Sequence, residues 1–202
     1  MYKINNSGWI EAIIGPMYSG KTEELIRRVK RAKIAEQSCI LFKPQLDDRY
    51  SEDNIVSHDG TDIKSRVVNT LAELDEIIDR NGKIDVIAID EVQFFNIEEF
   101  SSKAKSFNLL EMLNSYADEG IRVIVTGLDM DFAGRPFKPI PELISMAEYV
   151  DKLHAICTIC GNPATRTQRI IDGKPAKKDD PLILVGSNEA YEARCRTHHI
   201  VL

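Results

Sequence analysis

An octapeptide near the start of the chain, Gly15-Pro-Met-Tyr-Ser-Gly-Lys-Thr22, matches the pattern G-x-x-x-x-G-K-[ST]. The pattern holds nucleotide phosphates when a strand precedes it and a helix follows it. Here the apolar run Trp9–Ile14 predicts a buried strand before the loop, and Leu25, Ile26 and Val29 recur at helical spacing after it. The chain is therefore expected to build a strand–loop–helix unit that binds phosphate; a glycine turn carrying Lys-Thr by chance is the competing interpretation.

The residue types in this loop suit a phosphate chain and its metal ion. Two glycines let backbone N–H groups approach an anion closely. The helix that follows directs the positive end of its dipole at the same anion. We expect Lys21 to place its charge near the β- and γ-phosphates and Thr22 to offer its hydroxyl to Mg²⁺. The expected nucleotide-binding residues of the loop are Gly15, Pro16, Met17, Tyr18, Ser19, Gly20, Lys21 and Thr22.

Charge and composition exclude several classes of protein. The net charge of −6 over 202 residues gives no basic field to collect nucleic-acid phosphates, so no nucleic-acid partner is expected. The segment 1–8 lacks the apolar stretch of a signal peptide, and no segment approaches membrane-spanning length. These observations predict a cytoplasmic protein with no membrane partner. In that reducing compartment the four cysteines are expected to be thiols or metal ligands.

Strand-like and helix-like segments alternate through the first three quarters of the chain. Further strands are predicted at 38–42, 85–89 and 122–126, and helices at 71–80, 109–118 and 142–150. Uninterrupted apolar strands between helices indicate an α/β fold, with a parallel sheet covered by helices on both faces. Cys39 lies within one of these strands and is interpreted as a small core residue.

The chain is predicted to divide near residue 152. Residues 1–152 form the expected nucleotide-binding α/β domain, and residues 153–202, where glycine, proline and charged residues become frequent, form a small second subdomain. Within the first domain the stretch 43–64 is polar with few apolar anchors, so we interpret it as a mobile loop that could cover the nucleotide.

Two acids, Asp90 and Glu91, follow directly on the strand predicted at 85–89. Ligands of open parallel sheets bind beyond the carboxyl ends of the strands, where the phosphate loop also opens. One acid can hold Mg²⁺, and the second can accept a proton from an attacking hydroxyl if it lies within hydrogen-bond reach. An Asp-Glu pair that merely ends the strand is the competing interpretation.

Cysteine and histidine spacing predicts a structural zinc site in the second subdomain. Cys157 and Cys160 form a C-x₂-C pair, and Cys195 and His198 form a matching C-x₂-H pair. Three thiolates and one imidazole suit tetrahedral Zn²⁺ with no position left for water. The alternatives are free thiols, a redox C-x-x-C, and His199 in place of His198; the two-residue spacing favours His198.

In combination these segments closely resemble one family, the cytosolic, zinc-containing thymidine kinases of type II. The resemblance covers nearly the whole chain and is strongest to bacterial members. It is carried by the phosphate loop, the knuckle pair, and the segments 46–50, 58–60, 89–95, 128–132, 135–137, 160–164, 173–176 and 186–191. It implies a P-loop NTPase-type domain with a C-terminal zinc-binding subdomain, and transfer of the γ-phosphoryl group of ATP to the 5′-hydroxyl of thymidine with Mg²⁺.

The resemblance also implies roles for single residues. Glu91 matches the catalytic base, Lys21 and Arg49 match groups that steady the transferring phosphoryl, and Thr22 and Asp90 match the magnesium site. The nucleotide is expected to contact the phosphate loop and Asp90, Glu91, Val92 and Gln93. Matched positions around the nucleoside are Met17, Asp47, Phe95, Leu128, Phe132, Phe137, Thr167, Val185, Gly186 and Tyr191, and the segment 184–191 matches a loop that grips thymine.

The family's assembly and regulation are carried over as further expectations: a homotetramer inhibited by thymidine triphosphate. Two other functions compete with this one. A P-loop ATPase module whose zinc knuckle acts on nucleic acid is disfavoured by the acidic balance and by the lack of a basic, aromatic strip. A regulatory GTPase needs an Asn-Lys-x-Asp tetrapeptide, which does not occur here.

Overall fold

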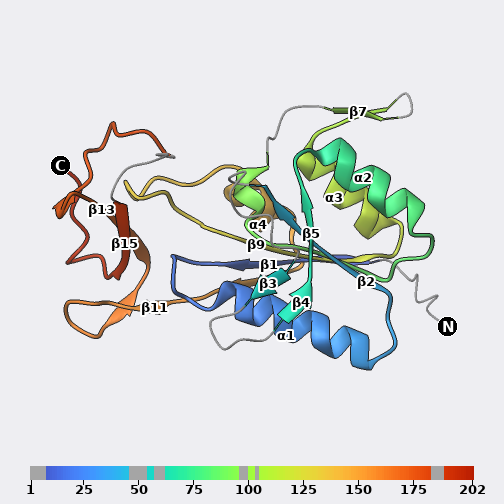
Figure 1. Ribbon diagram of the computed structural model, residues 1–202, viewed down its shortest axis with the longest axis horizontal. Coiled ribbons are helices and arrows are strands. Elements are labelled where there is room, and N and C mark those ends of the chain that lie inside the picture. The colour runs from blue at the N-terminus through green and yellow to red at the C-terminus, as the bar shows by residue number, and fades with distance from the viewer. Residues whose placement is uncertain (1–7, 46–53, 57–61, 96–99, 103–104, 183–188) are drawn as a thin grey trace.

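A six-stranded sheet forms the centre of the molecule in the computed structural model, which describes residues 8–45, 54–56, 62–95, 100–102, 105–182 and 189–202 (Figure 1). All of its strand pairings are parallel, in the order β10-β1-β9-β6-β2-β5. The strands are β1 (Trp9–Ile14), β2 (Cys39–Pro44), β5 (Arg66–Val68), β6 (Val86–Ile89), β9 (Arg122–Gly127) and β10 (Tyr149–Lys152).

Helices cover both faces of this sheet, which confirms the predicted α/β class. Helix α1 (Lys21–Ile34) lies on one face, and α2 (Leu71–Arg80) and α3 (Leu109–Asp118) lie on the other (Figure 1). Successive strand residues point to opposite faces, so Ile14 packs in the cluster with α2 and α3, whereas Ile13 packs against α1. Both faces are apolar, and the strands therefore read as continuous apolar runs.

Local signals account for the ends of these helices. Thr70 accepts a hydrogen bond from the N–H of Glu73 at the start of α2, and Asn108 and Glu111 form a reciprocal capping box at the start of α3. Helix α1 instead begins after Gly20, whose φ of 82° lies in the left-handed region. The start of α1 is thus set by the glycine of the phosphate motif rather than by a side-chain cap.

The prediction of a helix over 142–150 is wrong at its C-terminal end. Helix α4 (Ile140–Met146) stops at Met146, and the following residues form the edge strand β10, paired with β1 alone in the described sheet. All four residues of β10 are exposed. An edge strand of this kind has no apolar alternation, so its sequence carries none of the pattern that identifies a strand.

A second, smaller unit follows β10. Its strands are β11 (Ala155–Ile156), β12 (Pro163–Ala164), β13 (Arg166–Ile171), β14 (Lys174–Pro175) and β15 (Glu189–Arg194), joined as a β11–β12 pair and a three-stranded antiparallel sheet. In Figure 1 this unit lies beyond the end of β1 at which the chain turns into α1. Its core consists of three alanines and two cysteines: Ala155, Ala164, Ala193, Cys157 and Cys195.

Parts of the predicted loop 43–64 are described. Strands β3 (Asn54–Val56) and β4 (Asp62–Lys64) form an antiparallel pair, as do β7 (Phe100–Ser102) and β8 (Lys105–Phe107) further along the chain. The site residues Asp47, Arg49, Val185 and Gly186 expected from the sequence lie outside the described residues, as does most of the segment 184–191. Among the helices that the structure describes, none has the length and apolar character needed to cross a bilayer.

A buried carboxylate ties the sheet to helix α1. Glu11 of β1 is 5% exposed and accepts hydrogen bonds from Arg122 Nε at 2.6 Å, from Trp9 Nε1 at 2.7 Å and from Arg28. Burial alone would raise the pKa of Glu11, but the bonds from Arg122, Trp9 and Arg28 lower it below its ordinary value. The ionised carboxylate therefore stabilises the fold.

We expect Glu11→Gln to lower the free energy of unfolding by about 2 kcal/mol near neutral pH, because charged hydrogen bonds are lost. The folded pKa lies below the unfolded one, so this stability is present above the unfolded pKa and is lost as pH falls through the folded pKa. Urea unfolding at several pH values checks this: the gap between the two proteins should close in acid. The exposed Glu36→Gln is the control, and a gap that is independent of pH would contradict the assignment.

Candidate functional site

The phosphate motif forms a tight loop at the carboxyl end of β1. A side chain at Gly15 would place its Cβ 2.6 Å from the carbonyl oxygen of Leu153, so only glycine fits where the loop passes the end of β10. Lys21 Nζ donates to the carbonyl oxygen of Pro16 at 2.9 Å, and Ser19 Oγ donates to the same oxygen at 2.8 Å. The lysine predicted to contact phosphate thus lies across its own loop.

The hydroxyl of Thr22 meets the first of the two predicted acids. Thr22 Oγ1 donates to Asp90 Oδ2 at 3.0 Å, and Thr126 Oγ1 donates to the other carboxylate oxygen. In P-loop NTPases, a loop serine or threonine and an acid from another strand are the oxygen ligands that hold Mg²⁺. Residues predicted separately from the motif and from β6 therefore come together as one candidate metal site.

Glu91 has a strained backbone at the end of β6. Its φ of 51° lies in the left-handed region, which is uncommon for a residue with a side chain. The backbone N–H of Glu91 donates to Asp90 Oδ1 at 3.1 Å and to Thr126 Oγ1 at 3.2 Å, and these bonds hold the conformation. Gln93 Nε2 donates to the Glu91 carboxylate, while Gln93 Oε1 accepts from the N–H of Leu128 at 3.2 Å. The carboxylate is therefore oriented from two neighbouring elements.

The charged groups around the loop shift one another's pKa. Burial raises the pKa of Glu91, the negative charge of Asp90 raises it further, and Lys21 and Gln93 oppose the shift. Burial lowers the pKa of Lys21, against the attraction of Glu91, Asp90 and Asp129. A carboxylate with a raised pKa, placed beside the lysine that is expected to contact phosphate, has the character of a general base.

An apolar cavity of about 300 Å³ opens beside Glu91. This volume is at the lower end of the range typical of small-molecule sites. The polar groups that face the cavity are Glu91, Asp131 and Thr167, and Phe94 and Phe137 meet edge to face with ring centroids 5.9 Å apart. The remaining lining residues that the structure describes are Met17, Leu128, Met130, Phe132, Leu182 and Tyr191.

Six of the residues expected around a nucleoside line this one cavity: Met17, Leu128, Phe132, Phe137, Thr167 and Tyr191. Phe95 does not; it is 4% exposed and packs in the core with α2 and α3, while its neighbour Phe94 lines the cavity. The short 3₁₀ turn η1 (Val92–Phe94) follows Glu91 and sends adjacent side chains in different directions. Val92 is fully buried in that core as well.

The C-terminal unit closes the cavity and contacts the phosphate loop directly. The backbone N–H of Met17 donates to Thr167 Oγ1 at 3.0 Å, and the Tyr18 hydroxyl donates to the carbonyl oxygen of Tyr191 at 3.1 Å. Thr167 lies on β13 and Tyr191 on the adjacent strand β15. Strands β13 and β15 thus form one site with the loop, although these two contacts join residues 150 and 173 positions apart in the chain.

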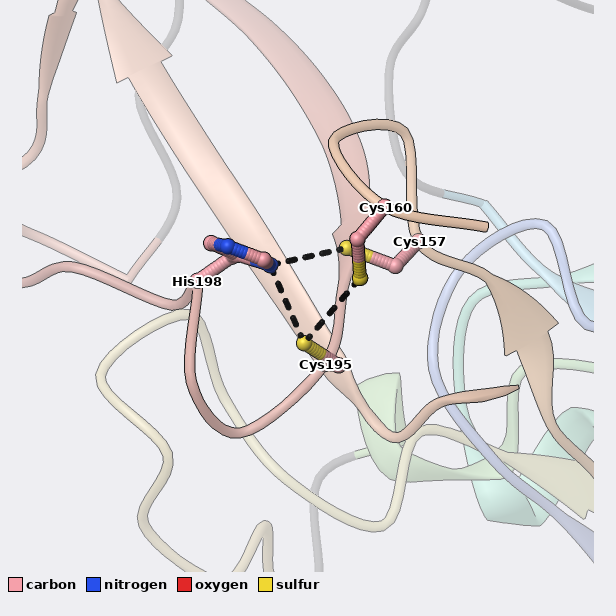
Figure 2. Close-up of side chains that lie close together, drawn as sticks. All are labelled: Cys157, Cys160, Cys195 and His198. Atoms are coloured by element: carbon pink, nitrogen blue, oxygen red, sulfur yellow. Dashed lines mark hydrogen bonds between the residues drawn. The ribbon is translucent and has the colours of Figure 1, made fainter. Parts of the chain in front are cut away.

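Four side chains in the C-terminal unit fit a zinc ion. The ligand atoms of Cys157, Cys160, Cys195 and His198 all lie within 4.8 Å of one another (Figure 2). Cys160 Sγ and Cys195 Sγ are 3.8 Å apart, and Cys195 Sγ lies 3.3 Å from His198 Nδ1. A tetrahedral site with Zn–S bonds of about 2.3 Å separates its sulfurs by about 3.8 Å. The donor set and the spacing both match that geometry.

Thiolate forms are favoured at two of these cysteines. Burial acts to raise the pKa of Cys157, but backbone N–H groups of Cys195, Ile159 and Cys160 and the His198 ring together lower it to about 5. The pKa of Cys195 is also lowered: burial again opposes the shift, and backbone N–H groups of His198 and Thr197 favour the thiolate. The backbone N–H of Asn162 acts to lower the pKa of Cys160, but burial and the nearby sulfurs of Cys157 and Cys195 raise it. Deprotonated sulfur is the form that ligates zinc, so Cys157 and Cys195 are the two members already favoured as ligands.

Tertiary structure distinguishes the two adjacent histidines. The ring of His198 lies among the cysteine sulfurs in Figure 2, with Nδ1 3.8 Å from Cys157 Sγ. His199 turns away, and its Nε2 lies 2.8 Å from the carbonyl oxygen of Phe132, so Nε2 carries a hydrogen that it donates. The cluster therefore contains His198, as the two-residue spacing favoured.

Sequence reasoning missed several residues of the site. Thr126 is fully buried at the end of β9 and orders Asp90, and Asp129 pairs with Lys152 at 2.8 Å beside the phosphate loop. Arg169 is fully buried on β13, under the rings of Phe132 and Tyr191. A threonine or acid just beyond an apolar strand was a usable signal for the first two, whereas a buried arginine leaves no local pattern.

Comparison with known proteins gives one family. A family model described as thymidine kinase matches residues 8–199. Among solved structures, the genome packaging NTPase B204 from Sulfolobus turreted icosahedral virus 2, in complex with sulfate, is similar with a TM-score of 0.44 and 17% sequence identity. That similarity covers 77% of this chain and 77% of the other.

Proposed function

This chain belongs to the thymidine kinase family, and from that premise we propose that it transfers the γ-phosphoryl group of ATP to the 5′-hydroxyl of thymidine. The observation that carries the proposal is the cavity beside Glu91, whose lining includes Met17 of the phosphate loop. A nucleoside in the cavity would lie next to a donor phosphate held by the loop. Acceptor and donor would then meet at a single carboxylate.

In the proposed reaction the thymidine 5′-oxygen attacks the γ-phosphorus of ATP. A new P–O bond forms, the bond from the γ-phosphorus to the β–γ bridging oxygen breaks, and ADP leaves. Glu91 accepts the proton of the hydroxyl, which suits a carboxylate whose pKa is raised by burial. Lys21 contributes positive charge to the transferring group, and the expected role of Arg49 is the same.

We propose Mg²⁺ as the metal that assists this step. Thr22 Oγ1 and the carboxylate of Asp90 are the oxygen ligands that would hold it, directly or through water. Bound there, Mg²⁺ neutralises charge on the phosphates. Thr126 supports the site from the protein side, because its hydroxyl fixes one oxygen of Asp90.

The cavity wall supports a pyrimidine nucleoside as acceptor. Phe94, Phe132 and Phe137 supply flat apolar surface for a base, and Thr167 supplies a hydroxyl. The carboxylate of Asp131 is bound by its own turn, through Arg135 and the N–H of Ala133. The contacts expected from Asp47, Val185 and Gly186 remain part of this proposal, with their positions outside the described residues.

The remaining proposals concern the metal of the C-terminal unit, assembly and location. We propose that Cys157, Cys160, Cys195 and His198 hold a structural Zn²⁺, since their geometry leaves no ligand position for water.

The family resemblance supports a homotetramer with feedback inhibition by thymidine triphosphate. The four cysteines form no disulfide in the structure, which supports a reducing cytoplasmic location.

Product analysis with ATP, Mg²⁺ and a panel of nucleosides tests the function. We expect thymidine monophosphate and ADP in equal amounts, with little ATP hydrolysis when no nucleoside is present. Rapid ATP hydrolysis that DNA stimulates, with no nucleoside monophosphate, would instead identify a nucleic-acid ATPase and refute the proposal.

A further inference from the structure

We propose that His199 is a positioning residue that couples the Cys/His cluster to the acceptor cavity through Phe132. The histidine next to the cluster donates a hydrogen bond from Nε2 to the Phe132 carbonyl oxygen, at 2.8 Å. Phe132 is 5% exposed and its side chain lines the cavity. One residue therefore joins the segment that carries the metal ligands to a wall of the site.

The cluster end of this link is fixed by the chain around His199. The backbone N–H groups of His198 and His199 both donate to the carbonyl oxygen of Cys195, at 3.1 Å. The next residue, Ile200, exchanges two hydrogen bonds of 2.8 Å with the side chain of Gln168 on β13. The direction of the His199 ring is thus set by a turn that contains two members of the cluster, Cys195 and His198.

The cavity end is held from a second side. The guanidinium of Arg169 lies under the Phe132 ring, 5.1 Å from its centroid, and Arg169 Nη1 donates to the carbonyl oxygen of Pro181 at 2.6 Å. Arg169 also lies 6.0 Å from the centroid of Tyr191, another lining residue. Arg169 fixes the ring of Phe132 and His199 fixes its backbone, so loss of the His199 bond frees the wall on the cluster side.

The turn that follows Phe132 also packs against the ring of His199. A Cβ at Gly134 would lie 3.6 Å from the ring carbon Cε1 of His199, so the turn after Phe132 lies directly against that ring. We therefore expect that an ordered conformation of the turn carrying Cys195 and His198 strengthens nucleoside binding and leaves phosphate binding by the loop unchanged.

His199→Leu removes the donor and is expected to weaken equilibrium binding of thymidine to the full-length zinc-loaded protein about five- to tenfold. Zinc content and the KM for ATP should stay unchanged. His199→Gln keeps an N–H donor of similar reach and should restore most of the affinity, whereas the control His154→Leu, at an exposed histidine, should have no effect. Thymidine binding by His199→Leu equal to the unmodified protein would overturn the proposal.

This inference rests on the proposed function for the identity of the ligand, so a ligand-free readout separates the two. Fluorine NMR of protein labelled with 4-fluorophenylalanine reports on the Phe132 ring, and Phe132→Leu identifies its signal. We expect that signal to shift in His199→Leu and to return in His199→Gln. A shift in protein that phosphorylates no nucleoside would refute the function alone, whereas an unmoved signal would refute the coupling.

A double-mutant cycle tests the direction of the coupling. Cys160→Ser removes a metal ligand from an exposed position and should weaken thymidine binding through His199. Loss of the metal also loosens β13 and β15, so the same change should still cost affinity in a His199→Leu background, but less than in the unmodified protein, because the link is already broken. Fully additive losses would show that the cluster acts on the cavity by another route and would overturn the proposal.

Discussion

Replacing Glu91 by glutamine is expected to lower kcat for thymidine phosphorylation about 10²- to 10⁴-fold. The amide keeps the size of the side chain and its place at the cavity, but it cannot accept the proton of the 5′-hydroxyl. The KM for ATP should change little, and thymidine should still bind. Steady-state kinetics together with equilibrium thymidine binding make the comparison.

The pH dependence sharpens this result. Burial and Asp90 raise the pKa of Glu91, so the base loses its charge, and kcat falls, at a pH above the ordinary glutamate value of about 4.3. That acidic limb of the profile should be absent from Glu91→Gln. The exposed Glu142→Gln on α4 is the matched control and should retain both the rate and the limb. Near-normal turnover by Glu91→Gln would show that another group takes the proton.

Cys157→Ser is expected to reduce zinc from about one ion per chain to none. Among its described residues, the unit around Cys157 has an apolar core cluster of three alanines and two cysteines, so the metal supplies much of the free energy that holds it together. Because β13 and β15 of this unit bring Thr167 and Tyr191 to the cavity, thymidine binding should be lost with the metal. Elemental analysis, hydrogen exchange and thymidine binding measure the three effects.

Cys39→Ser provides the matched control for that substitution. Cys39 lies on β2 of the main sheet, where its thiol donates to the carbonyl oxygen of Gln37 at 3.3 Å. This variant should keep its zinc and its affinity for thymidine. An unmodified protein that purifies without metal, or a Cys157→Ser variant with unchanged exchange protection, would contradict a structural zinc site.

Local sequence patterns predicted the phosphate loop and the main sheet well. All four predicted strands and all of the helices before residue 120 occur near their expected bounds, because each is specified by an apolar run or by helical spacing within a few residues. Asp90 and Glu91 could be assigned to the same edge as the loop, since the carboxyl ends of parallel strands share one edge. Both edge strands were missed: β10 is exposed along its length, and β5 has only three residues, one of them buried, so neither carries such a pattern.

Contacts between distant segments needed the tertiary structure. The spacing of Cys157, Cys160, Cys195 and His198 predicted a tetrahedral ligand set, but only the direction of each ring shows that His198 joins the cysteines and that His199 contacts Phe132. Phe94 and Phe95 are equally apolar neighbours, and the turn after Glu91 decides which of them lines the cavity.

The amino-acid order alone determined the chemistry that this chain carries: a glycine loop with lysine and threonine, two acids after an apolar strand, and four soft metal ligands. These features are short-range, since each depends on residues a few positions apart and on the period of a single helix or strand. Folding decided how they combine. Met17 meets Thr167, and His199 meets Phe132, only because the packing of two separate sheets brings them together, and no spacing in the sequence records that packing.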